Sequence, residues 1–425
     1  MNKKPFRSAA CVAASVLLCI LCSCIAPLID TPAMRANAAQ GVTMLRDQYG
    51  TPQTVGGFKS AQLDNYTSIL ILKTAAYTGG ESFLHRAFGG LRADLPAKEG
   101  QSDWDAYGTY GDGSLSPTQG LSYTRYWHGY TLPLRLLLCV LNAANIQMLL
   151  YFVQTALMAY VLVLMLRRGL GATVPAFFTA YFLMMPFVMG VCLQYMTVSL
   201  PMLLACIAVL RFDDRIEAAV GMPAFFAVVG VLTNYLDLLT FPLAALGFPL
   251  VLLLLLHLKD EDSFLHLFAL SVACCAAWGL GYGGMWALKW VITGACFGWD
   301  RLYAIFAQIF LRVSTEANGQ SFSRLHALAL NLDVILSKSS YLLILSMTGA
   351  ASLLPAARRL LCEKKMGIDV RALVLLVPLA LAPAWYIVMA NHSVDHTYYT
   401  YRNLAAGVFA LFALLACLFE QRKKA

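Results

Sequence analysis

Charged residues are scarce in this chain of 425 residues, because Asp, Glu, Lys and Arg together make up only 13% of it. Soluble domains carry about twice that share. Hydrophobic residues make up 59%, and a soluble fold cannot bury that much apolar surface. The composition therefore excludes a cytosolic enzyme, a nucleic-acid-binding protein and a secreted disulfide scaffold. It predicts an all-α, polytopic helical membrane protein.

Nucleotide-binding and hydrolase motifs are also missing. The sequence has no Walker loop, no dinucleotide-binding glycine fingerprint and no GxSxG elbow. The long polar segment 28–130 has no cysteine, and the 12 cysteines of the chain lie almost entirely in or beside apolar runs. Cysteine packs there as a small hydrophobic residue. We therefore expect neither a disulfide framework nor a bound cofactor.

The apolar runs predict about ten transmembrane helices, each near the roughly 20 residues that cross a bilayer. The first run follows Lys3, Lys4 and Arg7, and we interpret it as an uncleaved helix rather than a signal peptide. Residues 132–143 and 302–312 are too short to span and are expected to be interfacial or re-entrant. The predicted spans are 9–27, 147–166, 173–191, 194–210, 217–233, 238–257, 265–290, 341–357, 371–390 and 403–420.

The basic residues predict the orientation. With the N-terminus inside, nearly all Lys and Arg residues of the short loops fall on the cytoplasmic side, as the positive-inside rule requires. Both termini are then cytoplasmic, and the protein lies in the cell membrane. The predicted parts are the first transmembrane helix 1–27, an extracytoplasmic loop 28–145 with interfacial helices, transmembrane helices 146–290, a second extracytoplasmic loop 291–340, and the last transmembrane helices with a basic tail, 341–425.

Polar side chains collect at the span ends on the predicted outer side. Ionisable residues at membrane depth are costly and usually mark a site. The expected general base is Asp30, just past the first span, or Asp64, which could instead cap a helix. The expected substrate-binding residues are Asn65, Tyr66, Arg125, Trp127, His128, Tyr130, Asn234, Asp237, His392, His396 and Arg402.

Each of these residues also has a purely structural interpretation. The Tyr and Trp residues fit an interfacial belt, Arg402 fits a helix anchor, and Asp237 fits a helix cap. Basic residues are scarce in the short outer loops, however, so an arginine there suits a phosphate or carboxylate. His392 and His396 are four residues apart, but no third ligand is evident. The sequence therefore predicts no metal site.

The arrangement resembles the GT-C superfamily of integral membrane glycosyltransferases, in the branch of the protein mannosyltransferases. An acid lies just outside the first span, a long outer loop follows, and Trp127-His128-Gly129-Tyr130 leads back into the membrane. Asp30 would match the acidic motif of that family, and His128 would match its His-Pro-Pro-like element. Asp30 is followed by Thr31-Pro32 instead of a second acid, so Asp64 remains a rival base. The chain also resembles a group of bacterial multi-pass membrane proteins with RYWHGY-like and NHS-x-x-H-x-x-x-TYR-like elements, which indicates no activity.

The resemblance implies a chemistry. The donor would be a sugar on a polyprenyl phosphate at the outer face, and the acceptor an envelope glycan, lipid or protein. The carboxylate would take the acceptor proton, and Arg402, Arg125 or protonated His128 would stabilise the leaving phosphate. Membrane lipid is an expected partner, and nucleic acid is not. A transporter or lipid flippase with broken helices and a non-catalytic envelope-assembly protein are the alternatives.

Overall fold

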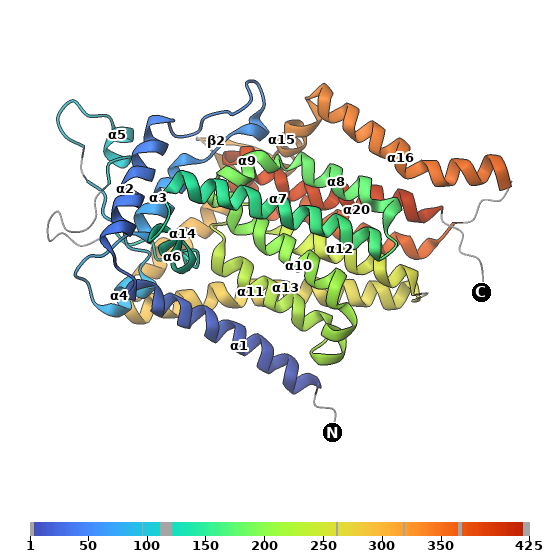
Figure 1. Ribbon diagram of the computed structural model, residues 1–425, viewed down its shortest axis with the longest axis horizontal. Coiled ribbons are helices and arrows are strands. Elements are labelled where there is room, and N and C mark those ends of the chain that lie inside the picture. Colours follow the sequence, from blue (N-terminus) through green and yellow to red (C-terminus); the bar gives the residue numbers. More distant parts are fainter. Residues whose placement is uncertain are drawn as a thin grey trace.

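The protein is a bundle of long helices capped at one end by short helices and loops (Figure 1). The computed structural model describes residues 4–95, 97–110, 121–260, 262–317, 319–363 and 368–419. Within these residues the strands are confined to one hairpin, β1 (Glu316–Ala317) and β2 (Gln320–Ser321). Residues 420–425 of the predicted basic tail and residues 111–120 of the predicted extracytoplasmic loop 28–145 lie outside the described residues.

Within the described residues, six helical segments are long and apolar enough to cross a membrane. A seventh exists if α15 (Arg324–Leu336) and α16 (Ser339–Glu363), which are bent by 87°, form one broken span. The all-α membrane architecture is therefore confirmed, whereas the predicted count of about ten is not. The six segments are Lys4–Leu28 with α1 (Lys4–Ile25), α7 (Ala143–Arg167), α10 (Leu193–Ala219), α13 (Phe264–Phe297), Val370–Val388 with α17 (Leu376–Val388), and Thr397–Leu418 with α19 (Thr397–Thr400) and α20 (Leu404–Leu418).

Three of the predicted spans fall on shorter helices. The run 173–191 breaks into α8 (Val174–Leu183) and α9 (Pro186–Val191), because Pro186 cannot continue a helix. The other two become α11 (Met222–Leu236) and α12 (Leu243–Lys259). Every residue of α12 up to Leu256 is buried. Its leucine-rich sequence therefore reflects enclosure by other helices rather than contact with lipid.

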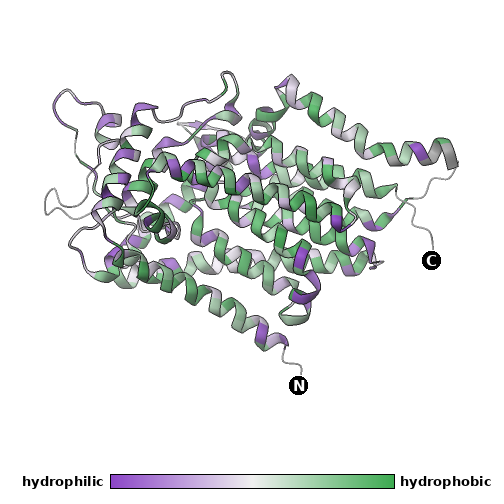
Figure 2. Ribbon diagram, in the orientation of Figure 1, coloured by the Kyte–Doolittle hydropathy of each residue, from purple (hydrophilic) through white to green (hydrophobic). Residues whose placement is uncertain are grey.

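One end of the bundle, here called the loop end, holds the short helices (Figure 1). Figure 2 shows many hydrophilic residues there and apolar residues along the bundle. Thr31 caps α2 and Ser82 caps α4 by accepting hydrogen bonds from backbone N–H groups three residues on. The short helices are α2 (Pro32–Asp47), α3 (Asn65–Ala75), α4 (Phe83–Phe88), α5 (Asp103–Tyr107), α6 (Thr131–Leu138), α14 (Arg301–Val313) and α18 (Ala390–Asp395).

The opposite end, here called the basic end, gathers residues that the sequence places in inner loops. Lys4 pairs with Glu217 at 2.7 Å, and Arg168 pairs with Asp213 at 2.5 Å. Lys259 donates to the Arg168 carbonyl at 2.7 Å. The segregation of these cations to one end agrees with the positive-inside pattern. The side of the membrane that this end faces remains a prediction.

Candidate functional site

Asp64 is a buried carboxylate at the start of α3, only 4% exposed. It caps the helix by accepting from the Thr67 backbone N–H and hydroxyl, each at 2.9 Å. The Tyr398 hydroxyl, from the last span, also donates to it at 3.1 Å. Burial raises the pKa of Asp64, and these three hydrogen bonds act in the opposite direction. Asp64 is thus both a helix cap and a carboxylate with a perturbed pKa.

An aromatic and histidine cluster adjoins Tyr398. The ring of Tyr399 stacks on His396 with centroids 5.1 Å apart, and His392 lies 5.0 Å from His396. His392 donates from Nε2 to the Leu239 carbonyl at 2.7 Å, so its Nδ1 is an acceptor. That buried Nδ1 has no hydrogen-bond partner among the described residues. Burial lowers the pKa of His396 to about 4 and that of His392 well below its usual value, so both rings are neutral.

Two arginines lie beside this cluster. Arg125 donates to the Gln308 side chain at 2.9 Å, and Arg312 donates to Nε2 of His396 at 3.0 Å. Gln308 and Arg312 are one turn apart on α14, so the two guanidinium groups are neighbours. Within the described residues, no carboxylate lies within the 4.0 Å ion-pair distance of either arginine. In the described part of the chain, Arg125 and Arg312 therefore have no carboxylate partner for their positive charges.

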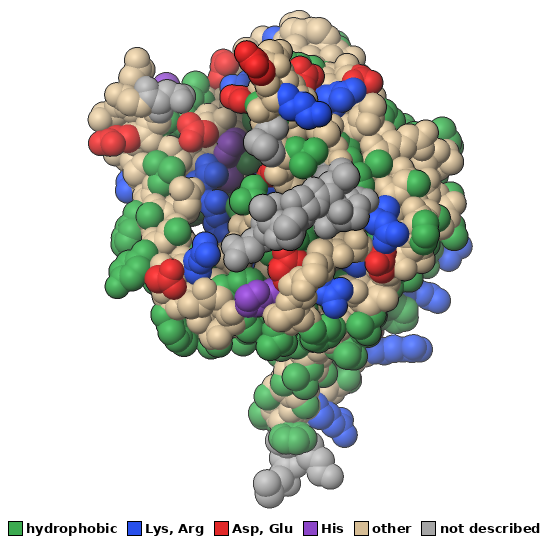
Figure 3. Space-filling model, turned by 90° about the vertical axis from the view of Figure 1, so that its left-hand side faces the viewer, with side chains coloured by type: hydrophobic (Ala, Val, Ile, Leu, Met, Phe, Trp, Pro, Cys, Tyr) green, Lys and Arg blue, Asp and Glu red, His purple; other side chains and the backbone are tan. Residues whose placement is uncertain are grey.

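Lys and Arg side chains also gather on the surface of the loop end. Figure 3 looks onto that end and shows Lys and Arg side chains gathered along a hollow, with His side chains beside them. Both Arg125 and Arg312 are half-buried. A partly desolvated cation interacts more strongly with an anion than a fully exposed one does. The arrangement suits a phosphate or another small anionic group.

Asp237 contributes a second buried carboxylate. It accepts from the Thr240 backbone N–H at 3.0 Å and from the Thr240 hydroxyl. Burial raises its pKa to about 6. The turn that it begins contains Leu239, with φ 66°, whose carbonyl holds His392. Asp237 is thus connected to the histidine cluster through this turn. Asn234 is buried one turn earlier on α11.

The Trp127-His128-Gly129-Tyr130 element is tightly held. His128 adopts a left-handed conformation with φ 58°, donates from Nε2 to the Tyr123 carbonyl at 2.8 Å, and accepts at Nδ1 from the Tyr130 hydroxyl at 2.7 Å. Trp127 donates to the Met285 carbonyl at 2.9 Å. Burial lowers the pKa of His128 to about 3. His128 is therefore neutral near pH 7, which leaves the arginines, and not protonated His128, to stabilise an anion.

Arg402 is fully buried and surrounded by carbonyl groups. It donates to Met184 at 2.8 Å, Tyr398 at 2.9 Å and Ser60 at 3.0 Å. Its guanidinium also lies 4.3 Å from the centre of the Tyr195 ring. These contacts tie the last span to the loop end, so the structure favours the anchoring interpretation of Arg402 over phosphate binding.

Asn65 and Tyr66 follow Asp64 but face different surroundings. Asn65 is buried and donates to the Tyr49 and Leu45 carbonyls at 2.7 and 3.2 Å. Tyr66 is exposed and packs edge-on against Trp104, with ring centroids 4.5 Å apart. Tyr66 therefore offers an exposed ring face that a sugar could reach, whereas the buried Asn65 side chain is already bonded to backbone carbonyls.

Asp30 lies away from this cluster. It is exposed and forms an ion pair with Arg35. Arg135 bridges the Ile29 and Tyr77 carbonyls at 2.7 and 2.6 Å, which places this segment beside the C-terminal end of α3. Asp64 caps the other end of α3, whose 11 residues extend about 16 Å. The structure therefore does not bring the two expected bases together.

An open apolar groove of about 500 Å³ runs between α6, α7, α10 and α11. Its lining is hydrophobic except for Tyr130 and Thr197. Toward the loop end it includes Tyr130, which bonds His128, and Leu236, which precedes Asp237. A second apolar groove of about 430 Å³ lies between α15, α16, α17 and α20. Apolar space thus reaches from the bundle surface to the polar layer of the site.

No protein-family model, curated protein or solved structure matches this chain. The resemblance to GT-C glycosyltransferases therefore depends on the sequence elements that carry it, and the function is argued below from the geometry.

The sequence analysis missed Arg312, Gln308 and the contacts of Tyr398 and Tyr399. The first two lie on the short helix that was expected to be interfacial, and their spacing of four residues was the available signal. The described side chains best placed to bind a metal ion lie elsewhere, at the basic end: His257, Asp262 and His266.

Proposed function

We propose that this protein is a membrane glycosyltransferase that moves a sugar from a polyprenyl-phosphate donor to an acceptor hydroxyl at the loop end. The observation that carries the proposal is the open apolar groove whose lining includes Tyr130, bonded to His128, and Leu236, adjacent to buried Asp237, together with two nearby arginines that have no carboxylate within ion-pair distance among the described residues. A polyprenyl-phosphate donor matches this arrangement, because its apolar chain would occupy the groove and its phosphate head would lie at the polar layer.

The groove supports a prenyl chain as its occupant. Its lining comes almost wholly from aliphatic side chains of α6, α7, α10 and α11. Beside membrane-spanning helices such a groove meets lipid rather than water, so a prenyl chain can occupy it without leaving an apolar environment. A water-soluble sugar nucleotide would gain nothing from this groove, whereas a lipid-linked sugar would place its head group at Tyr130 and Leu236.

The arginines support a phosphate as the head group. Arg125 donates to Gln308, Arg312 lies one turn from Gln308 on α14, and neither arginine has a carboxylate within ion-pair distance among the described residues. Arginine binds phosphate oxygens through charge-assisted hydrogen bonds. During transfer the phosphate gains charge as its bond to the sugar breaks, and preorganised cations stabilise that charge.

Asp64 is the proposed general base. The acceptor oxygen forms a bond to the anomeric carbon, and the bond from that carbon to the lipid-phosphate oxygen breaks. The acceptor proton passes to Asp64 directly or through one water, and the phosphate leaves with the electron pair. The unpartnered Nδ1 of His392 can accept a hydrogen bond from a sugar hydroxyl. Asp30 is set aside because its ion pair with Arg35 lies at the far end of α3.

The test is mass spectrometry of lipid-linked sugars and envelope glycans. Cells carry the intact protein, no protein, Asp64→Asn or the matched variant Asp30→Asn. Asparagine is also a good helix N-cap, so Asp64→Asn keeps the backbone cap of α3 and removes the base, while its amide nitrogen replaces the oxygen that accepts from the Thr67 and Tyr398 hydroxyls. We expect the deletion and Asp64→Asn to accumulate one prenyl-phosphate sugar and lose one glycan, while Asp30→Asn matches the intact protein.

The other outcomes are equally informative. If Asp30→Asn alone matches the deletion, the base is Asp30 and the class of enzyme stands. If the deletion changes no lipid and no glycan, the transferase proposal is overturned. If the glycans are unchanged but the lipid-linked sugar changes its side of the membrane, a lipid flippase replaces the transferase.

A further inference from the structure

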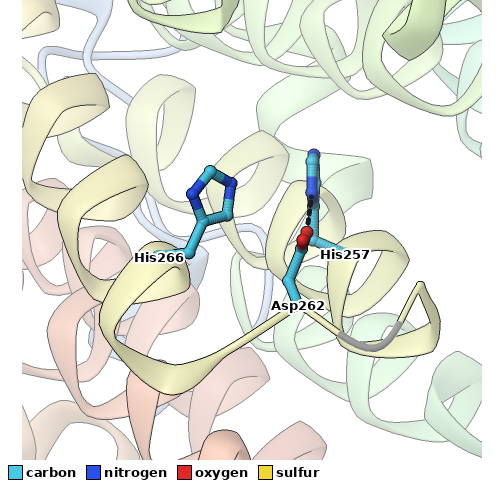
Figure 4. Close-up of side chains that lie close together, drawn as sticks. All are labelled: His257, Asp262 and His266. Atoms are coloured by element: carbon cyan, nitrogen blue, oxygen red, sulfur yellow. Dashed lines mark hydrogen bonds and ion pairs between the residues drawn. The ribbon is translucent and has the colours of Figure 1, made fainter.

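Three potential metal ligands converge at the basic end, far from the proposed transfer site. His257 is in the last turn of α12, Asp262 is in the turn after it, and His266 is in the first turn of α13 (Figure 4). One donor atom from each residue lies within 4.8 Å of the others. Two imidazoles and one carboxylate are a ligand set that zinc commonly uses.

The local structure fixes two of the three ligands. His257 and Asp262 already contact each other, with Nδ1 and Oδ2 2.7 Å apart. Arg371 donates to the Asp262 backbone carbonyl at 3.4 Å and is itself held by Asp369 through two bonds of 2.8 and 2.6 Å. The third ligand is less constrained, because His266 is exposed and its ring lies 6.5 Å from that of His257.

We propose that His257, Asp262 and His266 form a zinc site that links α12 to α13. Ligands about 2.0–2.2 Å from a tetrahedral zinc ion lie about 3.3–3.6 Å from one another. Rotation of the exposed His266 side chain brings its ring within that range of the contacting pair. Zinc takes the place of the proton between Nδ1 of His257 and Oδ2 of Asp262, and the neutral ring keeps its one proton on Nε2, so that His257 stays a neutral ligand. Water supplies the remaining position.

The charges around the cluster are compatible with a divalent cation. Two neutral imidazoles and one carboxylate leave one positive charge on the complex. Glu217, at the end of α10, is close enough to His257 for an electrostatic interaction and is paired with Lys4. Asp260 is exposed in the same turn. Arg371 donates to the Asp262 carbonyl and is neutralised by Asp369, and Lys259, two residues from His257, donates to the Arg168 and Gly169 carbonyls.

The site would join two very different helices. α12 is enclosed by protein along almost its whole length, and α13, with 34 residues, is the longest helix of the chain as described. α13 passes close to the proposed transfer site, because it carries Met285, whose carbonyl accepts a hydrogen bond from Trp127. A metal clamp would fix the connection between them and stabilise the fold by mass action.

The chain offers a matched control for His266. Ser263 accepts a hydrogen bond from the His266 backbone N–H at 3.2 Å, and Ser323 accepts from that of His326 at 3.2 Å. Both histidines are therefore third residues of a serine-capped helix, and both are exposed. Among the described residues, only His266 belongs to a cluster of three potential ligands. His326→Ala thus removes an exposed imidazole from the same helix position without removing a ligand of the cluster.

The experiment is zinc titration of the purified, chelator-treated full-length protein in detergent, by calorimetry. We expect one saturable site, an affinity at least about tenfold lower in His266→Ala, and no change in His326→Ala. Zinc should also raise the unfolding temperature of the intact protein and of His326→Ala, but not that of His266→Ala.

Cobalt(II) spectra distinguish this site from the cysteines. We expect visible bands without the intense near-ultraviolet absorption of a thiolate ligand. Thiolate absorption, the absence of a saturable site in the intact protein, or equal affinity in His266→Ala would each overturn the proposal.

Discussion

The phenol of Tyr398 donates a hydrogen bond to the carboxylate of Asp64 across 334 positions of sequence. This contact joins the cap of a short helix at the loop end to the first turn of the last membrane-spanning segment. It brings the carboxylate next to the ring of Tyr399 and the two histidines. The candidate site is therefore assembled from the loop-end segment that follows α1 and the C-terminal part of the chain.

Replacing Tyr398 by phenylalanine should change the pH dependence of transfer. A general base acts only when it is unprotonated, so activity rises with pH through the pKa of Asp64. The Tyr398 hydroxyl lowers that pKa by donating to the carboxylate. Its removal raises the pKa, and the acidic limb of kcat/KM against pH should move to higher pH while the plateau is retained. An acidic limb that stays in place or moves to lower pH would contradict the role of Asp64.

The arginine pair should decide affinity for the lipid phosphate. We expect Arg125→Gln and Arg312→Gln each to weaken the binding of polyprenyl phosphate by about tenfold to a hundredfold, because a hydrogen bond to a charged group contributes about 1.5–3 kcal/mol. Arg35→Gln is the control, since Arg35 is already paired with Asp30. Binding to purified protein in detergent measures the effect. Equal affinities in all three variants would place the phosphate elsewhere.

Arg402 should contribute to the free energy of unfolding. Lysine cannot reproduce the planar fork that serves three carbonyls and packs on Tyr195. Arg402→Lys should therefore lower the free energy of unfolding by about 2 kcal/mol, because buried carbonyls lose their donors. Arg35→Lys, at an exposed ion pair, should cost less than about 0.5 kcal/mol. Thermal unfolding in detergent compares them, and similar losses would show that Arg402 is not an anchor.

Gly90 should be required for the position of His128. Its φ is +56°, and a Cβ there would lie 2.3 Å from Nε2 of His128. Gly57 has a similar φ of +76° with open space around it. Gly57→Ala should cost about 1–2 kcal/mol from the backbone alone, and Gly90→Ala about 1–3 kcal/mol more from the clash. Chemical denaturation of both variants measures the difference, and equal costs would mean that His128 moves freely.

The elements of the loop end were largely predictable. The short apolar stretches 132–143 and 302–312 become α6 and α14, because neither is long enough to span. The number of spans was not predictable, because a leucine-rich run has the same hydropathy whether lipid or protein surrounds it. α12 is an example. Its hydropathy predicts a span, whereas its burial up to Leu256 depends on the helices that surround it in the assembled bundle.

The site was only partly predictable, for a similar reason. The sequence identifies Asp64 as an outer acid and His396 as an outer histidine, but the Tyr398 and Tyr399 contacts that connect them join distant segments. The choice between Asp30 and Asp64 depends on the direction of α3, which no local pattern gives. The zinc ligands were missed because His257 and His266 belong to two different helices whose turn brings them together.

The enclosure of α12 also dictates an order of assembly. A Cβ on Gly247 would lie 2.4 Å from the Cβ of Ala406, so α12 and α20 pack in direct contact. Translation reaches α20 about 150 residues after α12. Until then one face of α12 has no protein neighbour and must be covered by lipid or by the insertion machinery. A chain that stops before residue 404 would therefore expose the centre of the bundle, and cellular quality control can recognise unfinished molecules by that surface.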